Sequence, residues 1–159
     1  MEREIKFRGF SKKEVVPFSQ KREWVVGNLL TEEGFAAIHN GKFPVEVIPE
    51  TVGQFTGLTD KNKREIYEGD IIRRQLYDFM GHKRDAEYDF GVVYYDDEVG
   101  AFGYRGFPLH NLQFFDKIGT EDIEVIANYH DNPELTKWKF KKTGKNSGSY
   151  VPPQKLLEL

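Results

Sequence analysis

The sequence of 159 residues contains no cysteine, which excludes disulfides, thiolate zinc sites and cysteine nucleophiles. It also lacks any apolar run that approaches the roughly 20 residues of a membrane-spanning helix. The charged start, Met1 to Lys6, has no apolar segment of the kind that signal peptides carry. We therefore expect a protein of the reducing cytoplasm that has no contact with a membrane.

The sequence patterns of common catalytic sites are missing as well. No two of the four histidines have the spacing of a zinc-protease helix, and no Gly-x-Ser-x-Gly elbow is present. No glycine-rich loop carries the Lys-Ser/Thr pair that binds nucleotide phosphates. Because no convergent catalytic set is visible, we expect a protein that is not an enzyme. We also expect no cofactor and no metal-ligating residues.

Neither sign of charge is in large excess. The formal net charge of -3 provides no overall attraction to nucleic acid, so such binding would need a local basic patch. A chain of this length has room for one domain or for two small barrels, and it buries roughly 70% of its unfolded surface. Thirteen phenylalanines and eight tyrosines favour the half-buried surfaces of β-sheets.

Short runs of alternating or continuous apolar residues, bounded by glycine, proline and Asn/Asp turns, predict many β-strands. The predicted strands cover residues 4–8, 23–30, 35–39, 43–49, 52–55, 66–67, 71–77, 90–95, 101–104 and 123–129. The run at 90–95 is apolar on both faces, which predicts a central strand. The pair Asn40-Gly41 predicts a hairpin. The expected fold is mainly β and barrel-like, with short, strongly bent strands and one or two short helices.

Three further segments carry local signals. Asn132 followed by Pro133 and Glu134 predicts the start of a short helix. Residues 79–89 are charged and are expected to form a loop. Residues 143–153 are rich in Gly, Ser, Asn and Pro, which predicts a flexible tail or linker.

The stretch from residue 49 to residue 72 is the most distinctive part of the chain. Its glycines would let short strands bend, and its Asp and Asn side chains would tie the turns by bonding to nearby backbone amides. The signature residues of this stretch are Gly53, Gly57, Asp60, Asn62, Gly69 and Asp70.

This stretch also resembles a known family. Residues 50–58, the turn at 60–62 and residues 65–71 are similar to the signature of the YopX family of phage and prophage proteins. The flanks at 5–9, 24–27, 125–128 and 132–135 agree with that resemblance, which therefore spans about Ile5 to Leu135. It implies a β-rich, barrel-like protein of phage origin in the cytoplasm of a bacterial host. It lends no catalytic residues, because the family has no established activity.

Two positions depart from the family pattern. Lys63 and Ala127 stand where glycines are expected. Because Asn-Gly forms a two-residue hairpin turn directly, Lys63 predicts a longer or differently shaped turn after Asn62. Ala127 indicates a strand that tolerates a Cβ at this point.

The resemblance and the composition together predict the domain organisation. Residues 1–135 are expected to form a β-rich YopX-like domain, either undivided or built from two small barrel-like halves that meet near residues 66–70. Residues 136–159 are expected to form a basic, partly flexible C-terminal extension.

Basic residues are interleaved with aromatic ones in that extension. Such a pattern provides cations for phosphates and a ring for bases, which predicts a nucleic-acid contact. The alternative is that the lysines solvate a short helix and its tail while the tryptophan faces the core. The candidate contact residues are Lys137, Trp138, Lys139, Lys141 and Lys142.

Carboxylates gather at the corner formed by Glu65, Glu68 and Asp70. Hard cations bind several carboxylate oxygens at one point, so a metal-dependent hydrolase is one hypothesis. The competing explanation is structural, since carboxylates beside a glycine corner also accept backbone N–H bonds.

The preferred hypothesis is a non-enzymatic phage protein that binds a phage or host macromolecule or acts as an assembly module, with a homo-oligomer as one form of it. Nucleic-acid binding through the C-terminal segment and metal-dependent hydrolysis are the two alternatives.

Overall fold

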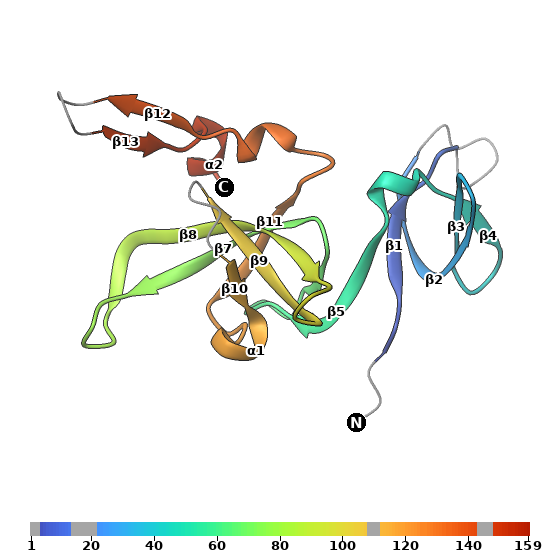
Figure 1. Cartoon of the computed structure of the whole chain (residues 1–159), viewed down its shortest axis with the longest axis horizontal. Helices are drawn as coiled ribbons and strands as arrows, with labels where there is room; N and C mark the ends of the chain where they lie inside the picture. Colours follow the sequence, from blue (N-terminus) through green and yellow to red (C-terminus); the bar gives the residue numbers. More distant parts are fainter. Residues whose placement is uncertain (1–3, 14–21, 108–111, 143–147) are drawn as a thin grey trace. The chain divides into compact units, whose positions relative to one another are not determined.

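The computed structural model of the chain describes residues 4–13, 22–107, 112–142 and 148–159. These residues are mainly β, with two short α-helices and two 3-10 helices among them, which confirms the predicted class (Figure 1). The chain divides into two compact units. The first contains residues 1–58 and 65–68, and the second contains residues 59–64 and 69–159. No helix in the described residues is both long enough and apolar enough to span a bilayer.

The first unit is built on a six-stranded antiparallel sheet with the order β4-β3-β2-β1-β5-β6. Its buried core residues are Val25, Ala36, Ile38, Val45 and Val47. Its elements are β1 (Phe7–Phe10), β2 (Trp24–Glu32), β3 (Phe35–His39), β4 (Pro44–Glu46), η1 (Pro49–Thr51), β5 (Gly53–Thr59) and β6 (Glu65–Tyr67), with Thr59 of β5 assigned to the second unit.

The hairpin that Asn40-Gly41 predicts lies between β3 and β4, and its turn contains residues 40–43, because His39 pairs with Pro44. The Asn40 side-chain oxygen accepts hydrogen bonds from the N–H groups of Lys42 and Phe43. Gly41 has a φ of 92°, a left-handed conformation that suits glycine. The local turn chemistry therefore sets the register of this hairpin.

A close contact between two backbones fixes β2 against β3. A Cβ on Gly27 would lie 2.0 Å from the carbonyl oxygen of His39, so only glycine fits there. The glycine inside this strand thus marks a close approach of two backbones.

The second unit contains a five-stranded sheet with the order β10-β9-β8-β7-β11. Strand β8 is central in it, as predicted from the apolar run at 90–95. The elements of this unit are β7 (Asp70–Tyr77), β8 (Lys83–Asp96), β9 (Ala101–Phe107), β10 (Leu112–Phe114), α1 (Phe115–Ile118), β11 (Ile123–Asn128), η2 (Pro133–Thr136), β12 (Lys139–Lys142), β13 (Gly148–Val151) and α2 (Gln154–Leu157).

One face of the five-stranded sheet is covered by the end of the chain. Leu135 and Leu156 are almost completely buried and pack with Ile71 and Phe90 in one core cluster. Trp138 packs against the same cluster. The C-terminal elements, coloured orange to red in Figure 1, therefore form part of the unit that contains the sheet.

Two segments differ from the sequence-based expectation. The expected loop at 79–89 is wrong from residue 83 onward, because β8 begins there and Tyr77 of β7 pairs with Lys83. The backbone hydrogen bonds between β7 and β8 hold this segment as a strand, although its charged side chains are exposed to solvent. The expected flexible segment at 143–153 is wrong at 148–151, because β13 pairs with β12 through backbone bonds that no local composition reveals. Residues 143–147 lie outside the described residues.

Other expectations remain predictions. Within the described residues, no ladder joins the edge strands of either large sheet to each other, so the barrel-like closure is not confirmed. The predicted domain boundary at residue 135 stays a prediction too. The helix expected at Asn132 is the 3-10 helix η2, and the Asn132 side chain makes no capping hydrogen bond.

Candidate nucleic-acid interface

Asp60 organises the turn in the signature stretch. Its side chain is buried, and one carboxylate oxygen accepts hydrogen bonds from the backbone N–H groups of Asn62 (2.8 Å) and Arg64 (3.0 Å). The other oxygen accepts one from the N–H of Val125 in β11, at 3.0 Å. A single carboxylate therefore closes the turn and attaches it to a strand 65 residues away.

Lys63 has a φ of 66°, the only positive value at a non-glycine residue in the described part of the chain. A side chain in this conformation costs roughly 1–2 kcal/mol, which glycine avoids. This is the position where the family resemblance leads us to expect glycine, and the lysine here adopts the conformation that a glycine would favour.

The signature glycines lie at bends and close contacts. Gly57 and Gly69 have φ values of 83° and 80°. A Cβ on Gly53 would lie 2.5 Å from the carbonyl oxygen of Glu68. In the second unit, the N–H of Gly69 donates to the carbonyl of Val93. These positions shape the backbone of the two units.

The carboxylates of the predicted corner have partners in the protein. Glu65 accepts hydrogen bonds from Lys6 Nζ and from the Tyr67 hydroxyl, both at 2.7 Å. The Lys6 bond, followed by the Tyr67 bond, lowers the pKa of Glu65. Glu68 accepts a bond from the backbone N–H of Gln54, at 2.9 Å.

Asp70, the third member, is fully buried and belongs to the second unit, whereas Glu65 and Glu68 belong to the first. Among the residues that the structure describes, no three His, Asp or Glu side chains form a group that could hold a metal ion. The hydrolase hypothesis stays a prediction.

The C-terminal lysines lie on a hairpin. In the ladder of β12 and β13, Lys139 pairs with Val151 and Lys141 pairs with Ser149. Because Lys139 and Lys141 are alternate residues of one strand, their side chains point to the same face, whereas Lys142 belongs to the opposite face. Trp138 is not among the residues that line the groove described next.

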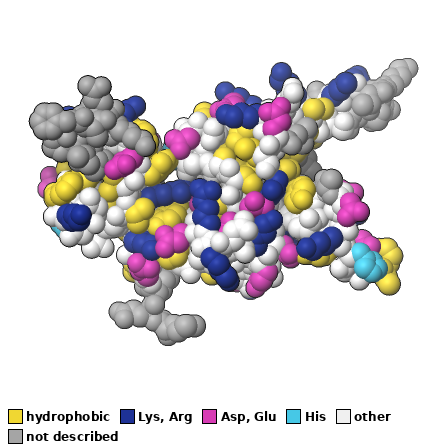
Figure 2. Space-filling model, turned by 180° about the vertical axis from the view of Figure 1, so that it is seen from behind, with side chains coloured by type: hydrophobic (Ala, Val, Ile, Leu, Met, Phe, Trp, Pro, Cys, Tyr) yellow, Lys and Arg dark blue, Asp and Glu magenta, His cyan; other side chains and the backbone are white. Residues whose placement is uncertain are grey.

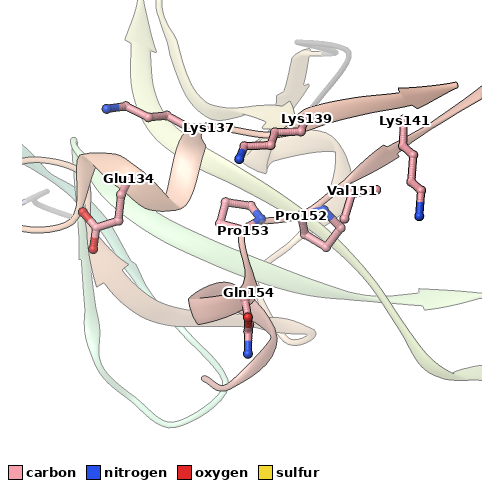
Figure 3. Close-up of a pocket in the computed structure, with 8 residues that line it drawn as sticks. All are labelled: Glu134, Lys137, Lys139, Lys141, Val151, Pro152, Pro153 and Gln154. Atoms are coloured by element: carbon pink, nitrogen blue, oxygen red, sulfur yellow. The ribbon is translucent and has the colours of Figure 1, made fainter.

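A groove beside this hairpin has a volume of about 560 Å³. Figure 3 shows the side chains that line it. We call it the lysine groove. Its lining residues are Glu134, Lys137, Lys139, Lys141, Val151, Pro152, Pro153 and Gln154.

The electrostatics of the lysine groove favour an anion. In the described structure none of Lys137, Lys139 and Lys141 has a carboxylate partner, and all three are exposed. Glu134, the one acid among the described residues that line the groove, accepts a hydrogen bond from Lys155 Nζ at 2.8 Å. That bond lowers the pKa of Glu134 and offsets its charge. The described lining of the groove therefore includes three positive charges that no described carboxylate offsets.

Trp138 has a different environment from the lysines. Its ring packs against Phe90, with centroids 6.2 Å apart, and its indole N–H is buried without a hydrogen-bond partner in the described structure. This placement corresponds to the alternative in which the tryptophan faces the core. Its proposed contact with nucleic acid stays a prediction, and its observed contacts attach the start of β12 to the core cluster of the five-stranded sheet.

Sequence reasoning missed the apolar side of the groove. Val151, Pro152 and Pro153 belong to the segment that composition assigns to a flexible tail. The only local signal was the apolar run that ends in two prolines, a typical strand terminus. The partner strand of that run cannot be identified from local sequence.

Comparison with known proteins identifies the family. The model of the YopX family, described as YopX protein, matches residues 6–137. The chain belongs to the YopX family. The match includes the signature stretch and extends to Lys137, the first of the three lysines that line the groove.

No curated protein matches this YopX-family chain. Among solved structures, it is similar to the crystal structure of protein EF1440 from Enterococcus faecalis, with 23% sequence identity and a TM-score of 0.48. That similarity covers 86% of this chain and 100% of the other.

Proposed function

We propose that this YopX-family chain is a non-enzymatic binding module whose macromolecular partner is single-stranded nucleic acid, held in the lysine groove. The observation that carries the proposal is a groove lined by three exposed lysines, which have no carboxylate partner among the described residues, together with the apolar residues Val151, Pro152 and Pro153. A positively charged groove that follows the backbone is the common feature of proteins that bind single strands.

The spacing of the lysines supports an extended polyanion. Alternate residues on a strand are roughly 7 Å apart, so Lys139 and Lys141 can contact successive phosphates of an extended strand. The rings of Pro152 and Pro153 provide an apolar surface for sugars and bases. A point charge on a flexible stem suits phosphate contacts that do not depend on sequence.

The overall charge of -3 does not oppose this proposal. Figure 2 shows Lys and Arg side chains lying among Asp and Glu side chains on the face that it presents, as expected for a small net charge. Attraction to phosphates is local, because charges more than about 8 Å apart are largely screened at physiological salt. The charges that line the lysine groove therefore determine the electrostatic attraction for a strand bound there.

Fluorescence anisotropy with a labelled oligothymidylate at low salt tests the proposal. The variant K137Q/K139Q/K141Q removes the three charges, and we expect it to bind about tenfold more weakly or worse. The matched control K13Q/K42Q/K117Q removes three exposed lysines outside the groove and should bind like the unmodified protein. Equal affinity of both variants would refute a role for the groove.

The other parts of the hypothesis concern assembly and origin. A homo-oligomer, a barrel-like closure and a phage or host protein as partner are proposals that no observation above tests. Sedimentation equilibrium, with and without the oligonucleotide, distinguishes a monomeric binder from an assembly module. A strict monomer in both conditions would contradict the assembly role.

A further inference from the structure

A second depression lies on the same unit as the lysine groove. It has a volume of about 410 Å³, and we call it the aromatic hollow. Strands β8 and β9 provide four of its residues, and the segment after β11 and the 3-10 helix η2 provide one each. Its lining residues are Val92, Tyr94, Arg105, Phe107, Tyr129 and Thr136.

The register of the sheet explains why these side chains meet. Val92 of β8 is paired directly with Arg105 of β9. Tyr94 follows Val92 by two residues on β8, and Phe107 follows Arg105 by two residues on β9, so all four side chains lie on the same face of the sheet. The Arg105 guanidinium lies 5.4 Å from the centre of the Tyr94 ring. Flat aromatic and guanidinium surfaces therefore lie next to each other on one wall of the hollow.

Its polar groups are few. The Tyr94 hydroxyl is buried and has no hydrogen-bond partner among the described residues. The Thr136 hydroxyl donates to the carbonyl of Pro133, so Thr136 mainly offers its methyl group. Tyr129 is 42% exposed, which leaves its ring open to a ligand. The hollow thus combines ring surfaces, one cation and one unsatisfied hydroxyl.

This chemistry fits a planar, polar ring attached to an anion. Bases of single strands stack on aromatic side chains and on the guanidinium plane of arginine, and their edges bond to polar groups. The volume falls in the range of roughly 300–1,000 Å³ that is typical of small-ligand sites. A base within a duplex is stacked on its neighbours and has no free face for such a wall.

We infer that the aromatic hollow accepts one unpaired base of the strand that the lysine groove holds. This inference rests on the proposed function and adds the requirement for a base. The two depressions flank one short segment, because Glu134 and Lys137 line the groove and Thr136 lines the hollow. A strand whose phosphates follow the lysines can therefore direct a neighbouring base to Tyr129 and Arg105.

Two oligomers of equal length and charge test this inference. One is oligothymidylate, and the other is an abasic oligomer that keeps the phosphates but has no bases. We expect the protein to bind oligothymidylate about tenfold more tightly than the abasic oligomer, since stacking on one aromatic residue contributes roughly that factor. The variant Y129A should bind both oligomers equally, with the affinity of the abasic one unchanged, and R105Q should also lose the preference for oligothymidylate.

Conservative variants separate stacking from folding. Y129F keeps the ring and should retain the preference for oligothymidylate. Tyr95 is on the opposite face of β8 from Tyr94, so Y95A serves as a tyrosine variant outside the hollow and should also retain it. Thermal melting of each variant confirms that the fold is intact.

The possible outcomes have separate meanings. Equal binding of both oligomers by the unmodified protein would overturn the base inference while the phosphate-binding function stands. A preference that survives in Y129A and R105Q would also overturn it. Failure to bind either oligomer would overturn the proposed function together with the inference, and would favour a protein partner.

Discussion

Asp60 is the side chain whose removal should most damage the second unit. Its two carboxylate oxygens accept three backbone hydrogen bonds, one of them from the buried amide of Val125. In the variant D60A, water can replace the carboxylate at Asn62 and Arg64, because both residues are exposed. The Val125 amide would lose its partner inside the protein.

The magnitude follows from these three bonds. A hydrogen bond to a charged group contributes about 1.5–3 kcal/mol, and an unsatisfied buried amide costs about 1–3 kcal/mol. Because the two exposed amides recover much of their loss in water, we expect D60A to lower the free energy of unfolding by about 3 kcal/mol. D60N keeps one carbonyl oxygen as an acceptor and should lose about half as much.

The assay can isolate the second unit. The chain has two tryptophans, Trp24 in the first unit and Trp138 in the second. In a W24F background, urea unfolding followed by tryptophan fluorescence therefore reports on Trp138, which packs against Phe90. A loss below about 1 kcal/mol in D60A would refute the view that this carboxylate ties the turn to β11.

Two further predictions concern the turn and pH. K63G should raise the free energy of unfolding by about 0.5–1 kcal/mol in the same assay, because glycine adopts the positive φ of this position without strain, and a decrease would contradict that account. The hydrogen bond from Lys61, with a further one from Arg73, lowers the pKa of Glu124 from its ordinary 4.5. Ionised Glu124 therefore contributes its full stabilisation of the folded state above pH 4.5, its pKa in the unfolded chain. This contribution is lost as the pH falls through the lower pKa of the folded state. E124Q should therefore flatten the acid limb of a curve of unfolding free energy against pH. Parallel acid limbs in E124Q and the unmodified protein would show that this pair contributes nothing to the pH dependence.

The parts that sequence reasoning predicted well have local causes. The central position of β8 follows from an apolar run on both faces, and the β3–β4 hairpin follows from Asn40-Gly41. The sequence also marked position 63 as unusual, because lysine replaces an expected glycine there. It predicted a longer or differently shaped turn, however, and not the positive φ that Lys63 adopts. Each of these signals lies within about ten residues of the feature that it predicts.

The parts that it missed depend on pairing between distant segments. The lysines were recognised as a cluster, but the groove that they line also requires β13, whose sequence suggests a tail. Arg105 and Tyr129 are unremarkable in sequence and meet only because β9 and the segment after β11 fold toward the same depression. Composition allowed Trp138 either in the core or at a nucleic-acid contact, and it could not identify the packing partner Phe90, 48 residues earlier in the chain.

The salt dependence of binding tests the central claim most directly. Each phosphate that a lysine neutralises in a single strand contributes about -0.7 to the slope of log affinity against log salt, so three lysines predict a slope of about -2. We expect this slope for the unmodified protein with oligothymidylate, and a slope near zero for K137Q/K139Q/K141Q. The same slope in both proteins, or no salt dependence in the unmodified protein, would contradict binding through the lysine groove.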